Sequence, residues 1–227
     1  MYVITGDEVY RANTMHIIRN WEQMDPANYA YFVDSHIHTG VPLYRMVSAA
    51  EIMRYTSTQT PELEWTDQDT VNFTNNVIVP VTNTFNHTNN RFMNQHLYPL
   101  IGSISGYIFT GNVERYHEAV EWFTVNKTAE DQHMNGSIQR LFRLVDTNAA
   151  TGEKVDNPQV QITEMGRDQA HSTGDVINVS ILSRLLQAQG TKVDPVEGTV
   201  LQRRMPLPRM IFLTNAFWQA PTILPGI

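Results

Sequence analysis

Cysteine is missing from the 227-residue sequence, which excludes disulfide bonds and metal sites built on thiolates. The sequence also has no apolar run of the roughly 18 residues that a membrane-spanning helix requires. Basic residues are not clustered, and the net charge is −7, whereas nucleic-acid binding needs grouped Lys and Arg side chains against phosphates. We therefore expect neither a membrane nor a nucleic acid as the partner of this chain.

The composition is that of a globular protein, with 41% hydrophobic and 17% charged residues. Apolar residues recur at steps of three and four through most of the chain, and few segments alternate with a period of two. Residues 147–158 are expected to form a polar loop. Proline and glycine supply start and stop signals, so helices are expected over residues 6–25, 42–53, 67–82, 99–111, 113–123, 138–144 and 167–189. The pattern predicts an all-α array of antiparallel helices.

The stretch Glu164–His171 joins a polar segment to an apolar helical pattern. Five residues recur there at helical spacings on one face, namely Arg167, His171, Gly174, Asp175 and Asn178. A polar stripe on a helix with an apolar opposite side usually faces water or a cavity. Its cation, imidazole, carboxylate and amide suit a polar, anionic ligand. The alternative is an exposed helix face that carries ordinary surface residues.

A second candidate is the segment Asp34–Gly40, in which His36 and His38 are two residues apart. On a strand the two imidazoles would point the same way and could share a metal ion, as in the Asp-x-His-x-His start that this segment resembles in metal-dependent amidohydrolase barrels. On a helix they would lie on nearly opposite faces. The chain lacks the strand–helix alternation of such a barrel, so a loop whose imidazoles line a cleft is favoured over a metal site or a structural turn.

The third candidate is residues 86–98, which precede the helix expected from Pro99. This segment gathers Asn90, Arg91, Asn94, His96 and Tyr98. The free N–H groups and the dipole of a helix N-terminus favour a bound anion, so a ligand site is expected here. The alternative is a capping loop whose Asn and His side chains satisfy backbone groups.

These stretches, in this order and spacing, resemble the alginate-lyase-like domain of polysaccharide lyases. The specific part is residues 166–171, which read Gly-Arg-Asp-Gln-Ala-His where the family has Gly-Arg-Asp-Gln-Gly-His. Residues 135–138 (Asn-Gly-Ser-Ile), 34–40 and 94–96 match further family segments. The resemblance covers about residues 1–200 and implies an incomplete (α/α) toroid of antiparallel helical hairpins.

Two departures from the family pattern concern the ends of the chain. The segment matching Thr5-Gly6-Asp7 follows a longer N-terminal region in the family, so part of the toroid is expected to be missing. After residue 200 the family continues into an amphipathic helix, whereas residues 201–227 contain four prolines. Codons read in a shifted frame are compatible with such a helix. We therefore divide the chain into a partial toroid domain, 1–200, and a non-family tail, 201–227, that a frameshift near Leu201 would explain.

The resemblance implies that the protein cleaves an anionic, uronic-acid-containing polysaccharide by β-elimination, without a metal or cofactor. It assigns carboxylate contact and base work to Asn94 and His96, charge stabilisation to Arg167, and a second acid/base role to His171. The family places a catalytic tyrosine seven residues after the arginine, where this chain has Gly174; Tyr98, Tyr107 or His171 could take that role. Substrate subsites are assigned to His36, His38, Asn90, Arg91, Tyr98 and Gln169.

Secretion to the extracellular space or the periplasm is also implied, although residues 1–6 lack the basic start and cleavage site of a signal peptide. Two other interpretations stay open. One is a metal-dependent hydrolase that uses Asp34, His36 and His38. The other is a non-catalytic fragment that binds glycans or is inactive.

Overall fold

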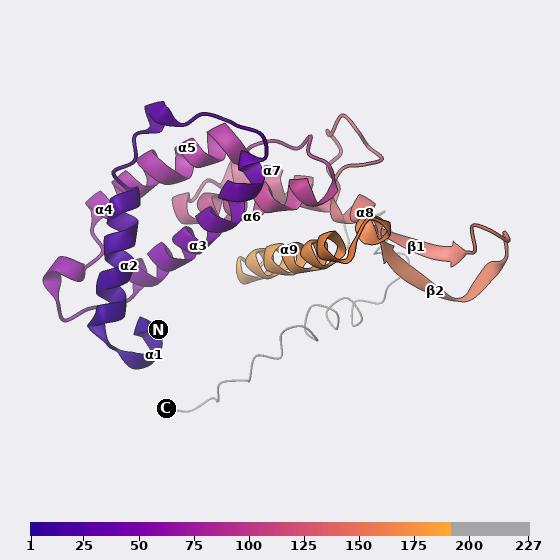
Figure 1. The fold of residues 1–227 in the computed structure, drawn as a ribbon. Coiled ribbons are helices and arrows are strands. Elements are labelled where there is room, and N and C mark those ends of the chain that lie inside the picture. Colours follow the sequence, from indigo (N-terminus) through magenta and orange to yellow (C-terminus); the bar gives the residue numbers. More distant parts are fainter. Residues whose placement is uncertain (192–227) are drawn as a thin grey trace.

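Figure 1 shows the fold in a computed structural model, which describes residues 1–191. Helices make up most of it, in agreement with the helical prediction, and a two-stranded β-hairpin projects from the helical body. The tail 201–227, its proposed frameshift and the boundary at residue 200 lie outside the described residues. Within the described part of the chain, no helix is both long and apolar enough to cross a bilayer.

The first predicted helix, over residues 6–25, is present but shorter, because it ends at Trp21 and not at Pro26. After the single turn α1 (Tyr2–Thr5), helix α2 (Glu8–Trp21) begins where the Asp7 carboxylate accepts a hydrogen bond from the Val9 amide at 3.0 Å. A 3₁₀ turn, η1 (Pro26–Asn28), follows the expected stop. The apolar face of α2 is buried in one of two hydrophobic clusters.

Helix α3 (Ser35–Tyr55) begins well before Pro42, so the predicted start at that proline is wrong. A proline inside a helix removes one backbone hydrogen bond and strains the preceding turn. Tertiary packing outweighs this cost, because α3 lies against both α2 and α6. The connection to the next helical segment contains a 3₁₀ turn, η2 (Pro61–Leu63).

Residues 67–86 form one continuous helical rod that contains two π-helical turns. Pro80 explains the irregularity, because its ring displaces the carbonyl of Asn76 from the regular ladder. That carbonyl instead accepts a hydrogen bond from the Tyr29 hydroxyl at 2.9 Å. The rod comprises α4 (Asp67–Phe73), η3 (Thr74–Ile78), α5 (Val79–Val81) and η4 (Thr82–Asn86), and so extends past the predicted end at residue 82.

Helix α6 (Met93–Thr110) is the centre of the fold and packs against α3, α7 and α9. It begins at Met93, so Pro99 is an interior residue, and the prediction of a loop up to Tyr98 is wrong. Its predicted end is confirmed at Gly111, whose φ of 66° lies in the left-handed region. Helix α7 (Val113–Thr124) then agrees with the predicted 113–123.

The predicted helix 138–144 and polar loop 147–158 are both corrected. A single turn α8 (Ile138–Leu141) leads into an antiparallel hairpin of β1 (Phe142–Thr147) and β2 (Lys154–Ile162). The hairpin extends away from the helices. At its helical end, the paired residues Phe142 and Ile162 reach the hydrophobic core. Because most of its residues face solvent, its strands lack the apolar alternation that would have identified them.

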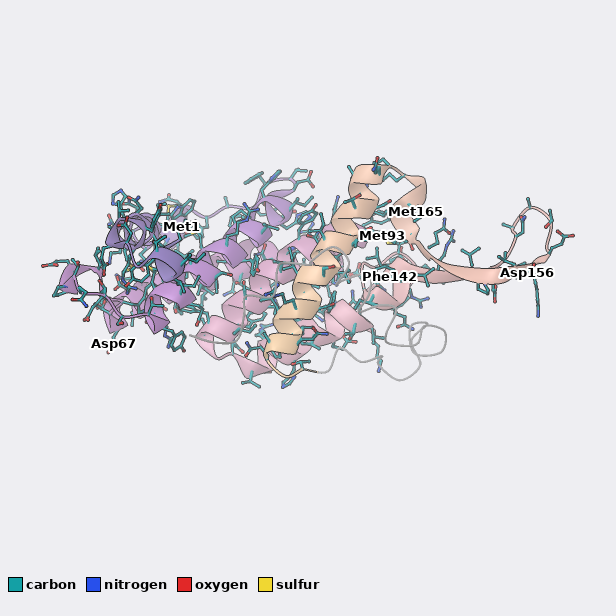
Figure 2. The ribbon with its side chains drawn as sticks, turned by 90° about the horizontal axis from the view of Figure 1, so that it is seen from below. Met1, Asp67, Met93, Phe142, Asp156 and Met165 are labelled. Atoms are coloured by element: carbon teal, nitrogen blue, oxygen red, sulfur yellow. The ribbon has the colours of Figure 1, made fainter. Side chains whose placement is uncertain are left out.

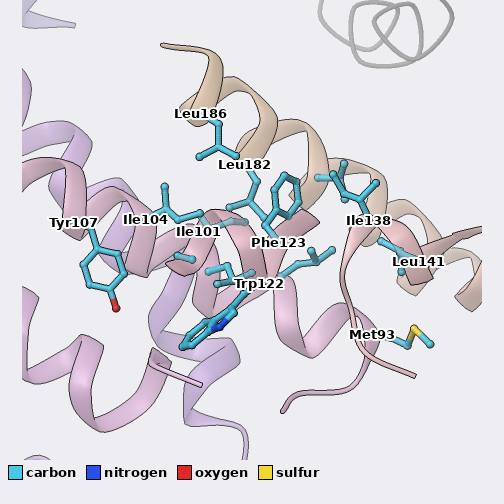
Figure 3. Close-up of a cluster of buried hydrophobic side chains, with 14 of the residues drawn as sticks. Met93, Ile101, Ile104, Tyr107, Trp122, Phe123, Ile138, Leu141, Leu182 and Leu186 are labelled. Carbon is cyan, nitrogen blue, oxygen red and sulfur yellow. The ribbon is translucent and has the colours of Figure 1, made fainter. Parts of the chain in front are cut away.

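A 3₁₀ turn, η5 (Thr163–Gly166), returns the chain to the body, and helix α9 (Gln169–Ala188) packs on α6. Gly190, with a φ of 72°, follows this helix as predicted. Figure 3 shows the second hydrophobic cluster, in which side chains from α6, α7, α8 and α9 meet. Its labelled members are Met93, Ile101, Ile104, Tyr107, Trp122, Phe123, Ile138, Leu141, Leu182 and Leu186.

Candidate functional site

The segments singled out in the sequence meet around the first two turns of α6. A Cβ on Gly40 of α3 would lie 1.9 Å from the carbonyl oxygen of Tyr98, and one on Gly136 would lie 2.0 Å from that of Met93. Only glycine permits such close backbone approach. From the other side, η5 reaches the same region, because the backbone amide of Asn94 faces the Glu164 carboxylate. Figure 2 labels Met165 of η5 and Met93, the first residue of α6. The fold therefore gathers stretches that are far apart in the sequence.

Because residues 93–98 are helical, the side chains predicted to share one loop point in three directions. Residues one turn apart share a face, and residues two apart do not. Tyr98 faces α9, Arg91 and Gln95 lie on the side of His36 in α3, and His96 is directed to α7. The helix thus separates the residues that the sequence analysis had grouped.

Tyr98 faces Gly174, the middle residue of the polar stripe that the sequence predicts on α9. Its hydroxyl oxygen lies 3.4 Å from the position that a Cβ on Gly174 would occupy. Asn94, one turn earlier on α6, is buried, and its backbone N–H faces the Glu164 carboxylate. A tyrosine hydroxyl of α6 therefore lies against Gly174, the position of α9 seven residues after Arg167.

His96 does not line a cleft, so its predicted placement is corrected. The side chain is fully buried, and its Nε2 lies 3.0 Å from the Trp122 carbonyl oxygen. Burial lowers the His96 pKa to about 4, so the ring is neutral at neutral pH. This position holds α6 against α7 and offers no exposed atom to a polymer.

Tyr107 is the second of the three residues that could have taken the tyrosine role, and its hydroxyl contacts His87. Its hydroxyl lies 3.0 Å from Nδ1 of His87, and burial raises its pKa to about 12. A tyrosine that ionises with such difficulty is poorly suited to act as a base near neutral pH.

His36 and His38 belong to the first turns of α3, so neither the strand nor the cleft-lining loop is confirmed. His36 is 1% exposed, whereas His38 is on the exposed side of the helix. Two residues apart on a helix, the rings diverge and cannot bind one metal ion. Among residues 1–191, no group of three or more His, Asp or Glu side chains is arranged to hold a metal.

His36 instead belongs to a network with Tyr31 and Arg91. The Tyr31 hydroxyl lies 3.0 Å from Nδ1 of His36, and the Arg91 guanidinium lies 5.2 Å from the centroid of the Tyr31 ring. Burial, and then the charge of Arg91, lower the His36 pKa. Tyr31 is 45% exposed and was not predicted; an aromatic residue five positions before a buried histidine is too common a pattern to identify it.

A pocket of about 230 Å³ lies beside this network and includes two predicted subsite residues, Asn90 and Arg91. The Asn90 side chain accepts a hydrogen bond from the Glu130 amide at 2.9 Å, which joins the two segments that form the walls. The lining residues are Asn89, Asn90, Arg91, Phe92, Ala129, Glu130, Asp131, Met134 and Asn135.

Arg167 lies in the turn before α9, so its prediction as part of the helical stripe is wrong. Asp168 caps the helix: its carboxylate accepts the His171 amide at 2.8 Å and lies 2.6 Å from Nδ1 of His171. The hydrogen bond from the His171 backbone, followed by the one from its side chain, lowers the Asp168 pKa. An ionised carboxylate only accepts, so Nδ1 carries a proton, which leaves the lone pair of the neutral imidazole on Nε2.

The arginine and the imidazole are both accessible at this helix start. The side chain of Arg167 is 53% exposed and that of His171 is 31% exposed. Arg167 is 3.6 Å from Glu164 and 3.9 Å from Asp168. Gln169, the first residue of α9, is also exposed. Asp168 was missed as an orienting residue, although an N-cap aspartate three residues before a histidine is a readable signal.

The second half of the predicted stripe is buried between α9 and α6, which corrects the expectation that the stripe faces water or a cavity. Asp175 is 0% and Asn178 is 3% exposed. Burial, and then the charge of Glu164, raise the Asp175 pKa to about 7.

No family model, curated protein or solved structure matches this chain.

Proposed function

We propose that this chain is a polysaccharide lyase that cleaves a uronic-acid-containing polymer by β-elimination. The observation that carries the proposal is the Asp168–His171 pair at the start of α9, with Arg167 beside it and Tyr98 packed against the same helix one turn later. These are an oriented base, an accessible cation and a hydroxyl acid, gathered from two segments.

β-Elimination removes a proton from the carbon next to the uronate carboxylate. That proton is very weakly acidic, so the reaction needs a positioned base and neutralisation of the carboxylate charge. A histidine is suited to the base role because its ordinary pKa lies close to neutral pH. The leaving sugar oxygen then needs a proton from an acid.

His171 is the base in this proposal. The hydrogen bond to Asp168 keeps the proton on Nδ1 and directs the lone pair of Nε2 outward, which is the way carboxylates orient catalytic imidazoles in other enzymes. Tyr98 is the acid that protonates the leaving oxygen. His96, which the resemblance favoured for base work, is replaced because its ring is buried.

Arg167 neutralises the uronate carboxylate, and Arg91 with its pocket receives a neighbouring sugar unit. A guanidinium binds a carboxylate through two parallel N–H groups, and Arg167 is exposed enough to do so. The pocket of about 230 Å³ combines amides, a cation and the partly exposed ring of Phe92, the groups that hold sugar hydroxyls and sugar faces.

The (α/α) toroid is part of the same proposal. Helices that follow each other in the chain pack together, as α2 with α3 and α6 with α7, and α6 and α7 are joined by a two-residue turn. Such short connections are typical of antiparallel helical hairpins.

The test is the ultraviolet absorbance of the unsaturated uronide that a lyase leaves at the new chain end. The chain is incubated with alginate, glucuronan and glycosaminoglycans. We expect absorbance to rise with one of them, and His171→Gln and Tyr98→Phe each to lower the rate by about 10²–10⁴-fold. Two exposed residues of α2 supply matched controls, His16→Gln and Tyr10→Phe, which should retain the rate.

Two outcomes contradict different parts of the proposal. If no polymer produces absorbance, the lyase function is wrong, and a glycan-binding or inactive protein is the better interpretation. If the chain cleaves a polymer but the His171 and Tyr98 variants do so at the wild-type rate, the assignment of base and acid is wrong.

A further inference from the structure

Two carboxylates, Glu164 of η5 and Asp175 of α9, are buried, and Glu164 is close enough for its charge to act on Asp175. Glu164 is 4% exposed and Asp175 is 0% exposed. Among the described residues, neither carboxylate oxygen of Asp175 has a hydrogen-bond partner, and Glu164 has near it only the backbone amide of Asn94 and the Arg167 guanidinium at 3.6 Å. Burying an unpaired carboxylate costs far more than burying a neutral acid, so such groups normally keep a proton.

The surrounding charges do not neutralise the pair. Arg167 lies 3.6 Å from Glu164, but its side chain is half exposed and also faces Asp168. Asp175 has Glu164 as its charged neighbour, and that charge opposes ionisation. The titratable side chains of α6 are His96, Tyr98 and Tyr107, of which His96 is neutral and directed to Trp122.

The effects of these neighbours on Glu164 have opposite signs. Burial raises its pKa, and Asp168 adds to the rise, whereas His171, Arg167 and the backbone amide of Asn94 lower it. Burial is the largest effect. Two acids that disfavour each other's ionisation at one site titrate as a pair, and the first proton is retained to unusually high pH.

In the sequence, Glu164 precedes and Asp175 follows the proposed base and cation. Glu164 lies three residues before Arg167, and Asp175 follows directly on Gly174, whose Cβ position is 3.4 Å from the Tyr98 hydroxyl. Between the two acids the chain carries Arg167, Asp168 and His171. A change that separates either carboxylate from α6 therefore moves the base and the cation relative to Tyr98.

We propose that Glu164 and Asp175 are positioning residues, and that a proton held on this buried pair keeps residues 164–175 packed against α6. While the proton is bound, the pair tolerates burial, and His171 and Arg167 are held near Tyr98. When the proton is lost to solvent, the two negative charges repel each other and draw water, and this segment separates from α6. The catalytic consequence rests on the proposed lyase function, whereas the packing consequence does not.

Hydrogen exchange tests the packing directly. Exchange of the backbone amides of residues 164–178 is measured at pH 6 and pH 8 and corrected for the intrinsic pH dependence of exchange. We expect protection of this segment to fall at least tenfold between the two values in the wild type and to stay level in Asp175→Asn, which is isosteric and cannot ionise. Glu164→Gln gives a second, independent variant with the same expectation.

Glu114→Gln, at an exposed carboxylate in the first turn of α7, is the matched control and should show the wild-type loss of protection. The proposal is overturned if the wild type is equally protected at both pH values. It is also overturned if both neutral variants lose protection as the wild type does.

Activity supplies the second readout. On the polymer that the chain cleaves, kcat should fall on the alkaline side of the pH profile in the wild type, and in Asp175→Asn this fall should move to higher pH by at least one unit with KM little changed. If no polymer is cleaved, the lyase function fails while hydrogen exchange still decides the role of the pair. An alkaline limb unmoved in both neutral variants contradicts the positioning role.

Discussion

The crossing of α3 and α6 depends on Gly40, and replacing this residue with alanine measures how tightly the site is held. An added Cβ would lie 1.9 Å from the carbonyl oxygen of Tyr98 and 2.6 Å from its carbonyl carbon. Ordinary contact begins at 3.4 Å, so the two helices would have to separate by about 1.5 Å at this point. Both contacting atoms belong to the backbone, and no side-chain rotation relieves the overlap.

Two effects of opposite sign decide the magnitude for Gly40→Ala. Alanine favours the helix over glycine by about 1 kcal/mol. Overpacking of a close-packed interior costs about 1–3 kcal/mol, and more where backbones collide. Because the collision is with backbone in the main helix–helix contact, we expect a net loss of about 2 kcal/mol in the free energy of unfolding, measured by urea denaturation.

Gly174→Ala in α9 is the matched control, with the opposite sign. The same Cβ would lie 3.4 Å from the Tyr98 hydroxyl, which is ordinary contact, so the helix preference should dominate and stabilise the protein by about 0.5–1 kcal/mol. If Gly40→Ala is as stable as the wild type, or if both substitutions change stability equally, the argument from close approach of α3 and α6 is refuted.

Three further predictions use other parts of the structure. His96 has a folded pKa of about 4 against an ordinary 6.5, so stability should be complete above pH 6.5 and fall by roughly 3 kcal/mol as the pH drops to 4; denaturation at several pH values checks this, and a flat profile contradicts it. Asp168→Asn should leave stability almost unchanged, because asparagine caps helices equally well, yet it should lower the proposed lyase activity because His171 loses its ionic partner. If this variant loses stability in proportion to activity, Asp168 acts as a helix cap and not as the orienting partner of His171. Phe73→Ala should cost about 3–5 kcal/mol in urea denaturation, since its ring is fully buried, and a loss below about 1 kcal/mol would be inconsistent with this packing.

Much of the helical structure could be predicted from the sequence, because apolar periodicity and capping residues act locally. The start of the first long helix near residue 6, the stop at Gly111 and the extent of α7 needed no tertiary information. The starts of α3 and α6 were misplaced because Pro42 and Pro99 look like first-turn residues. Packing around α6 extends both helices through their prolines, and local sequence does not contain that energy.

The candidate site shows the same division. From the sequence alone we could propose the segment 164–171 and the residues Arg167, His171 and Tyr98 as candidates, because their chemical types and spacing are visible without a fold. The tertiary structure decided which of the grouped residues stay together. It buried His96 and Asp175, exposed Arg167, and brought Tyr98 to Gly174. Side-chain chemistry belongs to the residue, whereas direction and burial depend on helix phase and on what packs against each face.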